Sequence, residues 1–134
     1  MIVKNDISEL NKIYSELEKI TKEHGFSEEL YSELCLCMDE VFSNIIKYAW
    51  DDDNEHNVEI LFDYKDEAKK FTITLVDDGK PFNPMEASDP DLSSNLFERE
   101  IGGLGIFIIS NIMSNIEYSR KNKKNRLQLT KEIE

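Results

Sequence analysis

The sequence has few of the residues that cross-link, break or anchor a chain. It contains two cysteines, three prolines and five glycines in 134 residues, and no apolar stretch approaches membrane-spanning length. The start, MIVKND, lacks the charged segment and apolar run of a signal peptide. Cys35 and Cys37 lie two positions apart on one predicted helix, where they point in different directions and cannot bridge each other. These absences predict a cytoplasmic protein with reduced thiols, no disulfide and no Cys/His metal set.

Positive charge is also scarce. The chain has 16 basic and 28 acidic residues, which gives a formal net charge of −12. This balance argues against a general surface for nucleic acid or for anionic membranes. The one basic run, RKNKK at residues 120–124, is more typical of a solvated turn between two strands. We therefore expect neither direct nucleic-acid binding nor membrane binding.

What is present indicates one globular domain over residues 1–134, because 40% of the residues are hydrophobic and the length suffices for one core. Apolar periodicity predicts helices over about 6–24, 29–50 and 101–113. Period-two alternation predicts strands near 58–62, 71–76, 116–120 and 126–133, with a short edge strand at 1–4. One-sided alternation predicts a mixed, mostly antiparallel sheet with about three helices on one face, a two-layer α/β (α+β) sandwich.

The predicted helix over 29–50 is the segment around which the other elements are organised. Its apolar positions recur every three or four residues, the spacing of a buried face: Leu30, Leu34, Cys37, Met38, Val41, Ile45 and Tyr48. Glu40 and Asn44 interrupt this face one turn apart, so both side chains emerge on the same side, with Lys47 three residues further on. A carboxylate and a carboxamide in such a helix must be hydrogen-bonded, metal-bound or at its rim.

Two glycine-containing segments follow. Asp77-Asp78-Gly79 ends a predicted strand, and Gly102-Gly103-Leu104-Gly105 opens the last predicted helix. Between them, a turn-rich segment that includes Pro81 leads into a long acidic loop reaching Glu100. A loop of this length inside a compact domain is usually functional, and often a lid.

Each of these three features also has an ordinary structural explanation. The Glu40/Asn44 pair can be a hydrogen-bonded pair on a helix surface, and such spacings are common. Asp-Gly is a standard signal for a tight turn. The glycines at 102–105 can form a hinge or a close contact between helix and sheet.

The chemical interpretation treats the same residues as parts of a nucleotide site. The Asn44 oxygen suits a magnesium ion that also binds phosphates, and Glu40 can orient or deprotonate an attacking hydroxyl. Asp77 can accept a hydrogen bond from an exocyclic amine, with Gly79 letting the ring approach the backbone. The glycines at 102–105 can present backbone amides to phosphate at a helix N-terminus.

Taken together and in order, these segments resemble a known superfamily. DEVFSNIIKYAW, VDDGKPFNP, EREIGGLGIFIISNIM and NRLQLTKEI are similar to the motifs of the Bergerat-type (GHKL) ATPases, which include the histidine kinases. Within that superfamily the chain is most similar to the small anti-sigma-factor serine kinases, from about residue 6 to residue 132. The resemblance implies a Bergerat-type fold with ATP and Mg²⁺ as ligands.

The resemblance also implies roles at the phosphate side of the nucleotide. Glu40 matches the catalytic glutamate, and Asn44 matches the magnesium-binding asparagine. Lys47 falls where a basic or polar residue often lies near the nucleotide. Gly103 and Gly105 match the second glycine box, in the segment Gly102 to Gly105 with Leu104 between them, which closes over the phosphates.

At the base side, Asp77 matches the aspartate that binds adenine and Gly79 matches the glycine beneath the base. Pro81 begins the segment that matches the start of the lid. One departure stands out, because many members carry a Gly-Thr pair entering the last strand, with the threonine near adenine. Lys124 and Asn125 occupy that place here, so no threonine contact is assigned.

The resemblance implies a function as an ATP-binding anti-sigma regulatory factor. In this reading the protein transfers the terminal phosphoryl group of ATP to a serine or threonine of a small anti-anti-sigma partner. A sigma factor is a possible second partner, and a homodimer is a possible assembly. The alternative is a binding module in which nucleotide only switches partner affinity, without significant catalysis.

Overall fold

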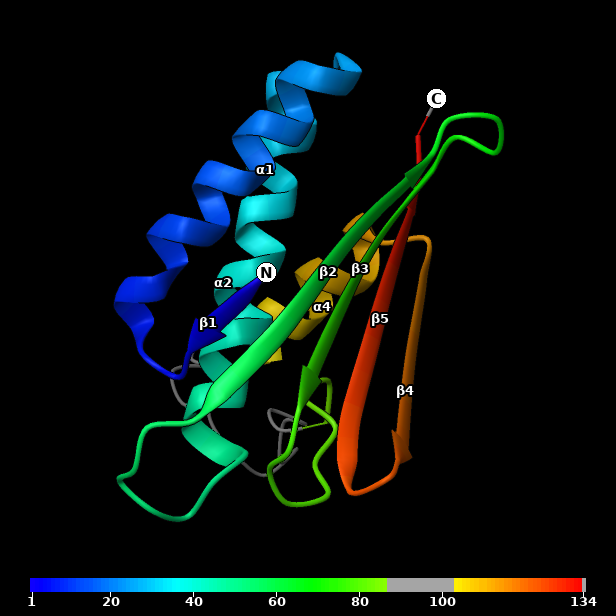
Figure 1. The fold of residues 1–134 in the computed structure, drawn as a ribbon. Helices are drawn as coiled ribbons and strands as arrows, with labels where there is room; N and C mark the ends of the chain where they lie inside the picture. Colours follow the sequence, from blue (N-terminus) through cyan, green and yellow to red (C-terminus); the bar gives the residue numbers. More distant parts are fainter. Residues whose placement is uncertain (87–102, 134) are drawn as a thin grey trace.

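The computed structural model describes residues 1–86 and 103–133 and shows two layers, a sheet and a set of helices on one of its faces (Figure 1). The helical elements are η1 (Ile7–Glu9), α1 (Leu10–His24), α2 (Glu28–Tyr48) and α4 (Gly103–Ile112). The strands are β1 (Ile2–Lys4), β2 (Asn57–Lys65), β3 (Lys70–Asp77), β4 (Asn115–Lys121) and β5 (Lys124–Glu132). The two-layer sandwich predicted from the sequence is confirmed.

The sheet has the strand order β1-β2-β3-β5-β4, and each of its four pairings is antiparallel. The central strand β3 lies between β2 and β5, and its last residue, Asp77, is opposite Val58 on one side and Asn125 on the other. The end of β3 is therefore enclosed by strands that are far apart in sequence.

Residues at the helix ends have the types that cap helices. Gly25 ends α1 with φ +70°, a left-handed conformation that glycine adopts without strain. Ser27 begins α2 by accepting a hydrogen bond from the Leu30 amide at 3.0 Å. The helix ends at Tyr48, two residues before the predicted end, and Trp50 contacts residues outside the helix. Its indole donates to Asp78 Oδ1 at 3.2 Å and its ring stacks on His56.

The core lies between the helices and the inner face of the sheet. Buried residues of α2 meet those of β2, β3 and β5, and they include Leu34, Met38, Phe42, Ile60, Phe71, Leu75 and Leu127. Burial of this face accounts for the position of α2, which packs against both α1 and α4. None of the helices in the described ranges is long and apolar enough to cross a membrane.

Candidate functional site

Helix α2 places Glu40 and Asn44 on one side, one turn apart, as the spacing predicts. Asn44 is 5% exposed, and its Nδ2 donates a hydrogen bond to the Pro84 carbonyl at 3.2 Å. Pro84 is itself buried, in the segment that follows β3. The asparagine therefore fixes the chain at the point where the predicted lid begins.

Glu40 lies against the beginning of α4. If Gly105 carried a Cβ, that atom would be 2.1 Å from Glu40 Oε2 and 2.3 Å from Cδ. No Cβ tolerates such distances. Only glycine at position 105 therefore lets the Glu40 carboxylate approach the backbone of α4 this closely. The two segments that the sequence singled out, 65 residues apart, are thus in contact through Glu40 and Gly105.

Of the other residues in the segment 102–105, only Gly103 and Leu104 are among the described residues. Gly103 begins α4 and Leu104 lies in its first turn, whereas Gly102 lies outside the described residues. The backbone amides at the N-terminus of a helix are the ones without intrahelical partners, and they favour anions. Glu40 and the N-terminus of α4 are therefore neighbours, as the assigned roles require.

Asp77 is buried at the end of β3, with 3% of its surface exposed. Its Oδ1 accepts two hydrogen bonds, from the Gly79 amide at 2.9 Å and from Asn125 Nδ2 at 3.0 Å. Within the described residues, no donor reaches its other oxygen, Oδ2. Oδ1 is therefore held by hydrogen bonds within the protein, and Oδ2 can accept a hydrogen bond from an amine of a ligand.

Burial raises the pKa of Asp77, because the charged form loses hydration. The hydrogen bonds from Asn125 and Gly79 lower the pKa, the Asp78 carboxylate raises it and Arg120 lowers it. The net direction is upward, so desolvation outweighs the hydrogen bonds. A buried carboxylate of this kind at a predicted ligand position is a recognised feature of functional sites.

Gly79 is required for a reason that the sequence did not show. A Cβ at this position would be 2.4 Å from the Ala49 carbonyl oxygen and 2.7 Å from the Ala49 Cβ. The chain after β3 therefore passes directly over the C-terminal end of α2, and the Lys80 amide donates to the same Ala49 oxygen at 2.8 Å. The predicted base side of the site is thereby attached to the helix that carries Glu40 and Asn44.

Lys47 and Pro81 are both exposed, near the C-terminal end of α2 and in the bend after Gly79. They are close in the sequence to a pair of rings that are in contact, Tyr48 and Phe82, whose centroids are 5.5 Å apart. Tyr48 follows Asn44 by one turn on α2, so Phe82 of the segment after β3 contacts this helix beyond the asparagine. The site residues predicted on α2 and in the segment after β3 are brought together.

Sequence reasoning left Asn125 and the β4 side chains that contact it without a role. Asn125 is 2% exposed and contacts Asp77, while Tyr118 and Arg120 of β4 both donate to its Oδ1. The signal that could have found it is strand register, since alignment of β5 against β3 puts Asn125 opposite Asp77. The register between two strands that are far apart in the sequence cannot be predicted from the alternation of apolar and polar residues in either strand alone.

A magnesium ion fits this site only together with phosphate. Within residues 1–86 and 103–133, no group of three or more His, Cys, Asp or Glu side chains could hold a metal ion. Donation from Asn44 Nδ2 to Pro84 identifies the other amide atom as the oxygen, the ligand type that Mg²⁺ prefers. Mg²⁺ commonly binds one or two protein oxygens plus substrate phosphates, which this arrangement matches.

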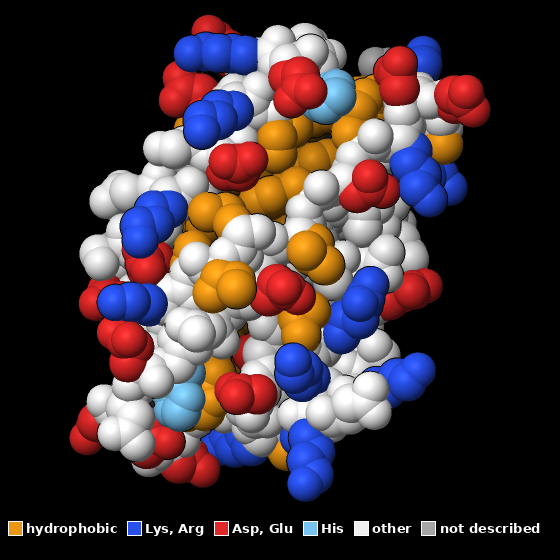
Figure 2. All heavy atoms as spheres, in the orientation of Figure 1, with side chains coloured by type: hydrophobic (Ala, Val, Ile, Leu, Met, Phe, Trp, Pro, Cys, Tyr) orange, Lys and Arg blue, Asp and Glu red, His pale blue; other side chains and the backbone are white. Residues whose placement is uncertain are grey.

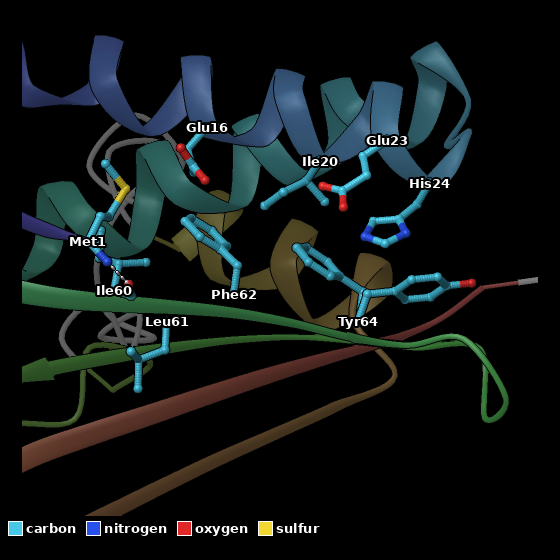
Figure 3. Close-up of a pocket in the computed structure, with 10 residues that line it drawn as sticks. Met1, Glu16, Ile20, Glu23, His24, Ile60, Leu61, Phe62 and Tyr64 are labelled. Atoms are coloured by element: carbon cyan, nitrogen blue, oxygen red, sulfur yellow. Dashed lines mark hydrogen bonds between the residues drawn. The ribbon is translucent and has the colours of Figure 1, made fainter.

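A separate hollow lies between α1 and β2, and it contains none of the predicted site residues. Its volume is about 350 Å³, and it is lined by side chains that include Glu16, Ile20, Phe62 and Phe71 (Figure 3). Figure 2 shows apolar side chains along this groove with acidic side chains at its borders. The groove and the predicted nucleotide site are different places on the molecule.

Comparison with known proteins agrees with the expected family. The family described as histidine kinase-like ATPase domain matches residues 3–131. Serine/threonine-protein kinase BtrW of Bordetella bronchiseptica is 28% identical over 114 residues, which cover 85% of this chain and 79% of BtrW. Serine-protein kinase RsbW of Listeria monocytogenes is 30% identical over 107 residues, which cover 75% of this chain.

A solved structure shows the same fold. The histidine kinase domain from the Erythrobacter litoralis EL346 blue-light activated histidine kinase matches 94% of this chain with a TM-score of 0.54 and 15% sequence identity. The chain spans 60% of that structure and 66% of RsbW, less than two thirds of each. At this identity the structural match shows the fold alone.

Proposed function

The chain belongs to the family of histidine kinase-like ATPase domains, and we propose that it is an ATP-dependent serine/threonine protein kinase that regulates an anti-anti-sigma-type partner. The single observation that supports this proposal best is the contact of Glu40 with Gly105 beside Asn44. It joins a candidate base, a candidate magnesium ligand and a helix N-terminus at one place. BtrW is named a serine/threonine-protein kinase and RsbW a serine-protein kinase, and these names support the same class of reaction.

In the proposed reaction, Glu40 accepts the proton of a serine or threonine hydroxyl of the partner. Bound Mg-ATP supplies the terminal phosphoryl group, which passes to that hydroxyl oxygen as the bond to the β-phosphate oxygen breaks and ADP leaves. Asn44 contributes its oxygen to the magnesium, and the amides at the start of α4, in the segment Gly103 to Gly105, face the phosphates. Such a transfer requires positioning and electrostatic stabilisation from the protein more than covalent chemistry.

At the base side, we propose that Asp77 Oδ2 accepts from the adenine amine, with Gly79 beneath the ring and Lys47 and Pro81 at the border of the site. A carboxylate accepts hydrogen bonds and donates none when ionised, so it selects an amine over a carbonyl. This gives adenine an advantage over guanine, which carries a carbonyl at the corresponding position. The whole span 1–134 acts as one ATPase domain in this proposal.

The partner is proposed from the family resemblance, as a small anti-anti-sigma-type protein with an acceptor serine or threonine and a sigma factor as a second ligand. The strongly acidic chain, with a net charge of −12, favours partners with a basic contact surface. No contact with nucleic acid or membrane is proposed. A homodimer is compatible with this function but not required by it.

The test is transfer of labelled phosphate from ATP to a candidate partner by the wild type and by Glu40→Gln. The variant keeps the size of the side chain and removes the base, so we expect transfer to fall roughly 100-fold or more, with ATP affinity within about threefold of wild type. Glu67→Gln, in the exposed turn between β2 and β3, is the matched control. Transfer at the wild-type rate by Glu40→Gln would remove Glu40 from the mechanism, and absence of transfer in the wild type would favour the nucleotide-switched module.

A further inference from the structure

Asn125 occupies the position opposite Asp77 in the pairing of β3 with β5. We propose that Asn125 is a positioning residue, which holds one oxygen of the Asp77 carboxylate so that the other is presented to the base of a bound nucleotide. The identity of that base rests on the proposed function. The positioning of Asp77 itself is a property of the protein without ligand and can be tested separately.

The amide nitrogen of Asn125 uses both of its hydrogens. Nδ2 donates to Asp77 Oδ1 at 3.0 Å and to the Lys80 carbonyl at 2.8 Å. One side chain thus connects the end of β3 to the segment that follows it. This connection sets the position of Asp77 relative to Gly79, whose amide donates to the same Oδ1.

The amide oxygen of Asn125 is equally occupied. Oδ1 accepts from the Tyr118 hydroxyl at 2.5 Å and from Arg120 Nη1 at 2.9 Å, with the Phe82 amide at 3.3 Å. These donors decide the orientation of the amide, because a flipped amide would turn its oxygen toward Asp77 and its NH₂ toward the guanidinium of Arg120. Arg120 Nη1 also donates to the Gly79 carbonyl at 3.0 Å, so the guanidinium fastens the glycine turn to the same cluster.

Neither threonine nor aspartate satisfies this set of partners. Threonine has one hydroxyl hydrogen, so it can donate to Asp77 or to the Lys80 carbonyl but not to both. Aspartate would place a second carboxylate oxygen where Nδ2 now lies, 3.0 Å from Asp77 Oδ1. Asparagine can donate hydrogen bonds to Asp77 and accept one from Arg120 at the same time. All polar atoms of its side chain are thus hydrogen-bonded, as a nearly fully buried position requires.

The charged and titratable groups around Asp77 come from several elements. Asp78 follows it in the chain, and Arg120 and Tyr118 approach from β4. Glu59 of β2 and Lys124 of β5 line a shallow hollow that Asp77 and Asp78 also border. Among these side chains, Asn125 is the uncharged one that donates directly to Asp77. Substitution of Asn125 should therefore change the position and the titration of the Asp77 carboxylate.

The first experiment follows the side-chain carboxyl carbon of Asp77 by NMR between about pH 4 and 9, without nucleotide. In Asn125→Asp two facing carboxylates share one proton, so the titration of the pair extends well above that of Asp77 in the wild type. Asn125→Ala removes a hydrogen bond that lowers the Asp77 pKa, so its titration moves upward by less. Asn125→Thr keeps one donor and falls between the wild type and Asn125→Ala.

Asn11→Asp and Asn11→Ala are the matched controls, because Asn11 is exposed in the first turn of α1. We expect both to leave the Asp77 titration where it is in the wild type. Asn125→Ala introduces no charge, so it provides the measurement if Asn125→Asp does not fold. An Asp77 titration that is the same in the Asn125 and Asn11 variants would overturn the proposal.

The second experiment measures ATP affinity against pH. In the wild type, acidification protonates Asp77 at Oδ2, the oxygen that no donor among the described residues reaches, and weakens binding. In Asn125→Asp the two facing carboxylates repel each other when both are ionised. Uptake of one proton between the facing oxygens removes this repulsion and leaves Oδ2 of Asp77 in place as an acceptor, so binding strengthens as the pH falls through the upper titration of the pair. We expect opposite pH slopes, with affinity at neutral pH roughly ten- to hundredfold lower in the variant. Slopes of the same sign would contradict the positioning role, whereas failure of the wild type to bind ATP would instead count against the proposed function.

Discussion

The Glu40 carboxylate of α2 lies directly on the Cα of Gly105 at the start of α4. An added Cβ at Gly105 would be 2.1 Å from Oε2, 2.3 Å from Cδ and 2.7 Å from Cγ of Glu40. The atoms in the way belong to a side chain and not to backbone. The contact therefore couples the identity of residue 105 to the position of the proposed catalytic base.

We predict that Gly105→Ala displaces Glu40 without unfolding the protein, because the Glu40 side chain can rotate away. Phosphoryl transfer should fall roughly tenfold or more, since a small misplacement of a catalytic group is costly, while thermal stability changes little. Transfer and melting temperature are measured on the same preparation. Gly25→Ala is the control, because it has open space but φ +70°, so it should lose roughly 1 kcal/mol of stability and keep activity. Full activity in Gly105→Ala would contradict the coupling.

Gly79→Ala should behave differently from Gly105→Ala. The nearest atom to an added Cβ is the Ala49 carbonyl oxygen at 2.4 Å, which is backbone at the C-terminal end of α2 and cannot rotate away. We expect a loss of about 2–3 kcal/mol in the free energy of unfolding. Urea denaturation measures it, and a loss below that of Gly25→Ala would show that the chain after β3 can move off the helix.

Asp77→Asn separates stability from ligand binding. The folded-state pKa of Asp77 is raised, so the folded protein binds the proton more tightly than the unfolded chain, and ionisation of Asp77 lowers stability as the pH rises through the folded-state pKa. An amide carries no such cost. We therefore expect Asp77→Asn to be more stable than wild type at pH 7, on the order of 1 kcal/mol, with the difference shrinking toward acidic pH.

The same variant should lose its preference for ATP over GTP, because the new NH₂ faces the base where Oδ2 was an acceptor. Calorimetric titration of both nucleotides measures the preference. Unchanged discrimination would contradict the assignment of Asp77 to adenine, whatever the effect on stability.

Asn44→Ala and Asn44→Asp distinguish two roles of one side chain. Alanine removes both the oxygen proposed for magnesium and the donor to the Pro84 carbonyl. Aspartate keeps an oxygen and removes only the donor. We expect ATP binding to lose its dependence on magnesium in Asn44→Ala and to keep it in Asn44→Asp, while both lose about 1–3 kcal/mol of stability. Magnesium dependence that persists in Asn44→Ala would exclude Asn44 as the ligand.

Local sequence signals were sufficient for most of the fold. The cap at Ser27, the left-handed residue Gly25 and the period of α2 depend on neighbours within a few positions, so they could be predicted. The same holds for the two-layer arrangement, because helix and strand faces with one apolar side have few ways to bury it. The family motifs then supplied the candidate residues in chain order.

Contacts between distant segments were decided only by the tertiary structure. That Gly79 passes over Ala49, that Gly105 touches Glu40 and that Asn125 holds Asp77 are facts of register and packing across segments 30 to 65 residues apart. The sequence by itself determined which residues have the chemistry that we propose for a nucleotide site. The packing of α4 on α2 and of β5 on β3 decided how they meet, because close approach depends on the geometry of both partners and neither segment encodes the other.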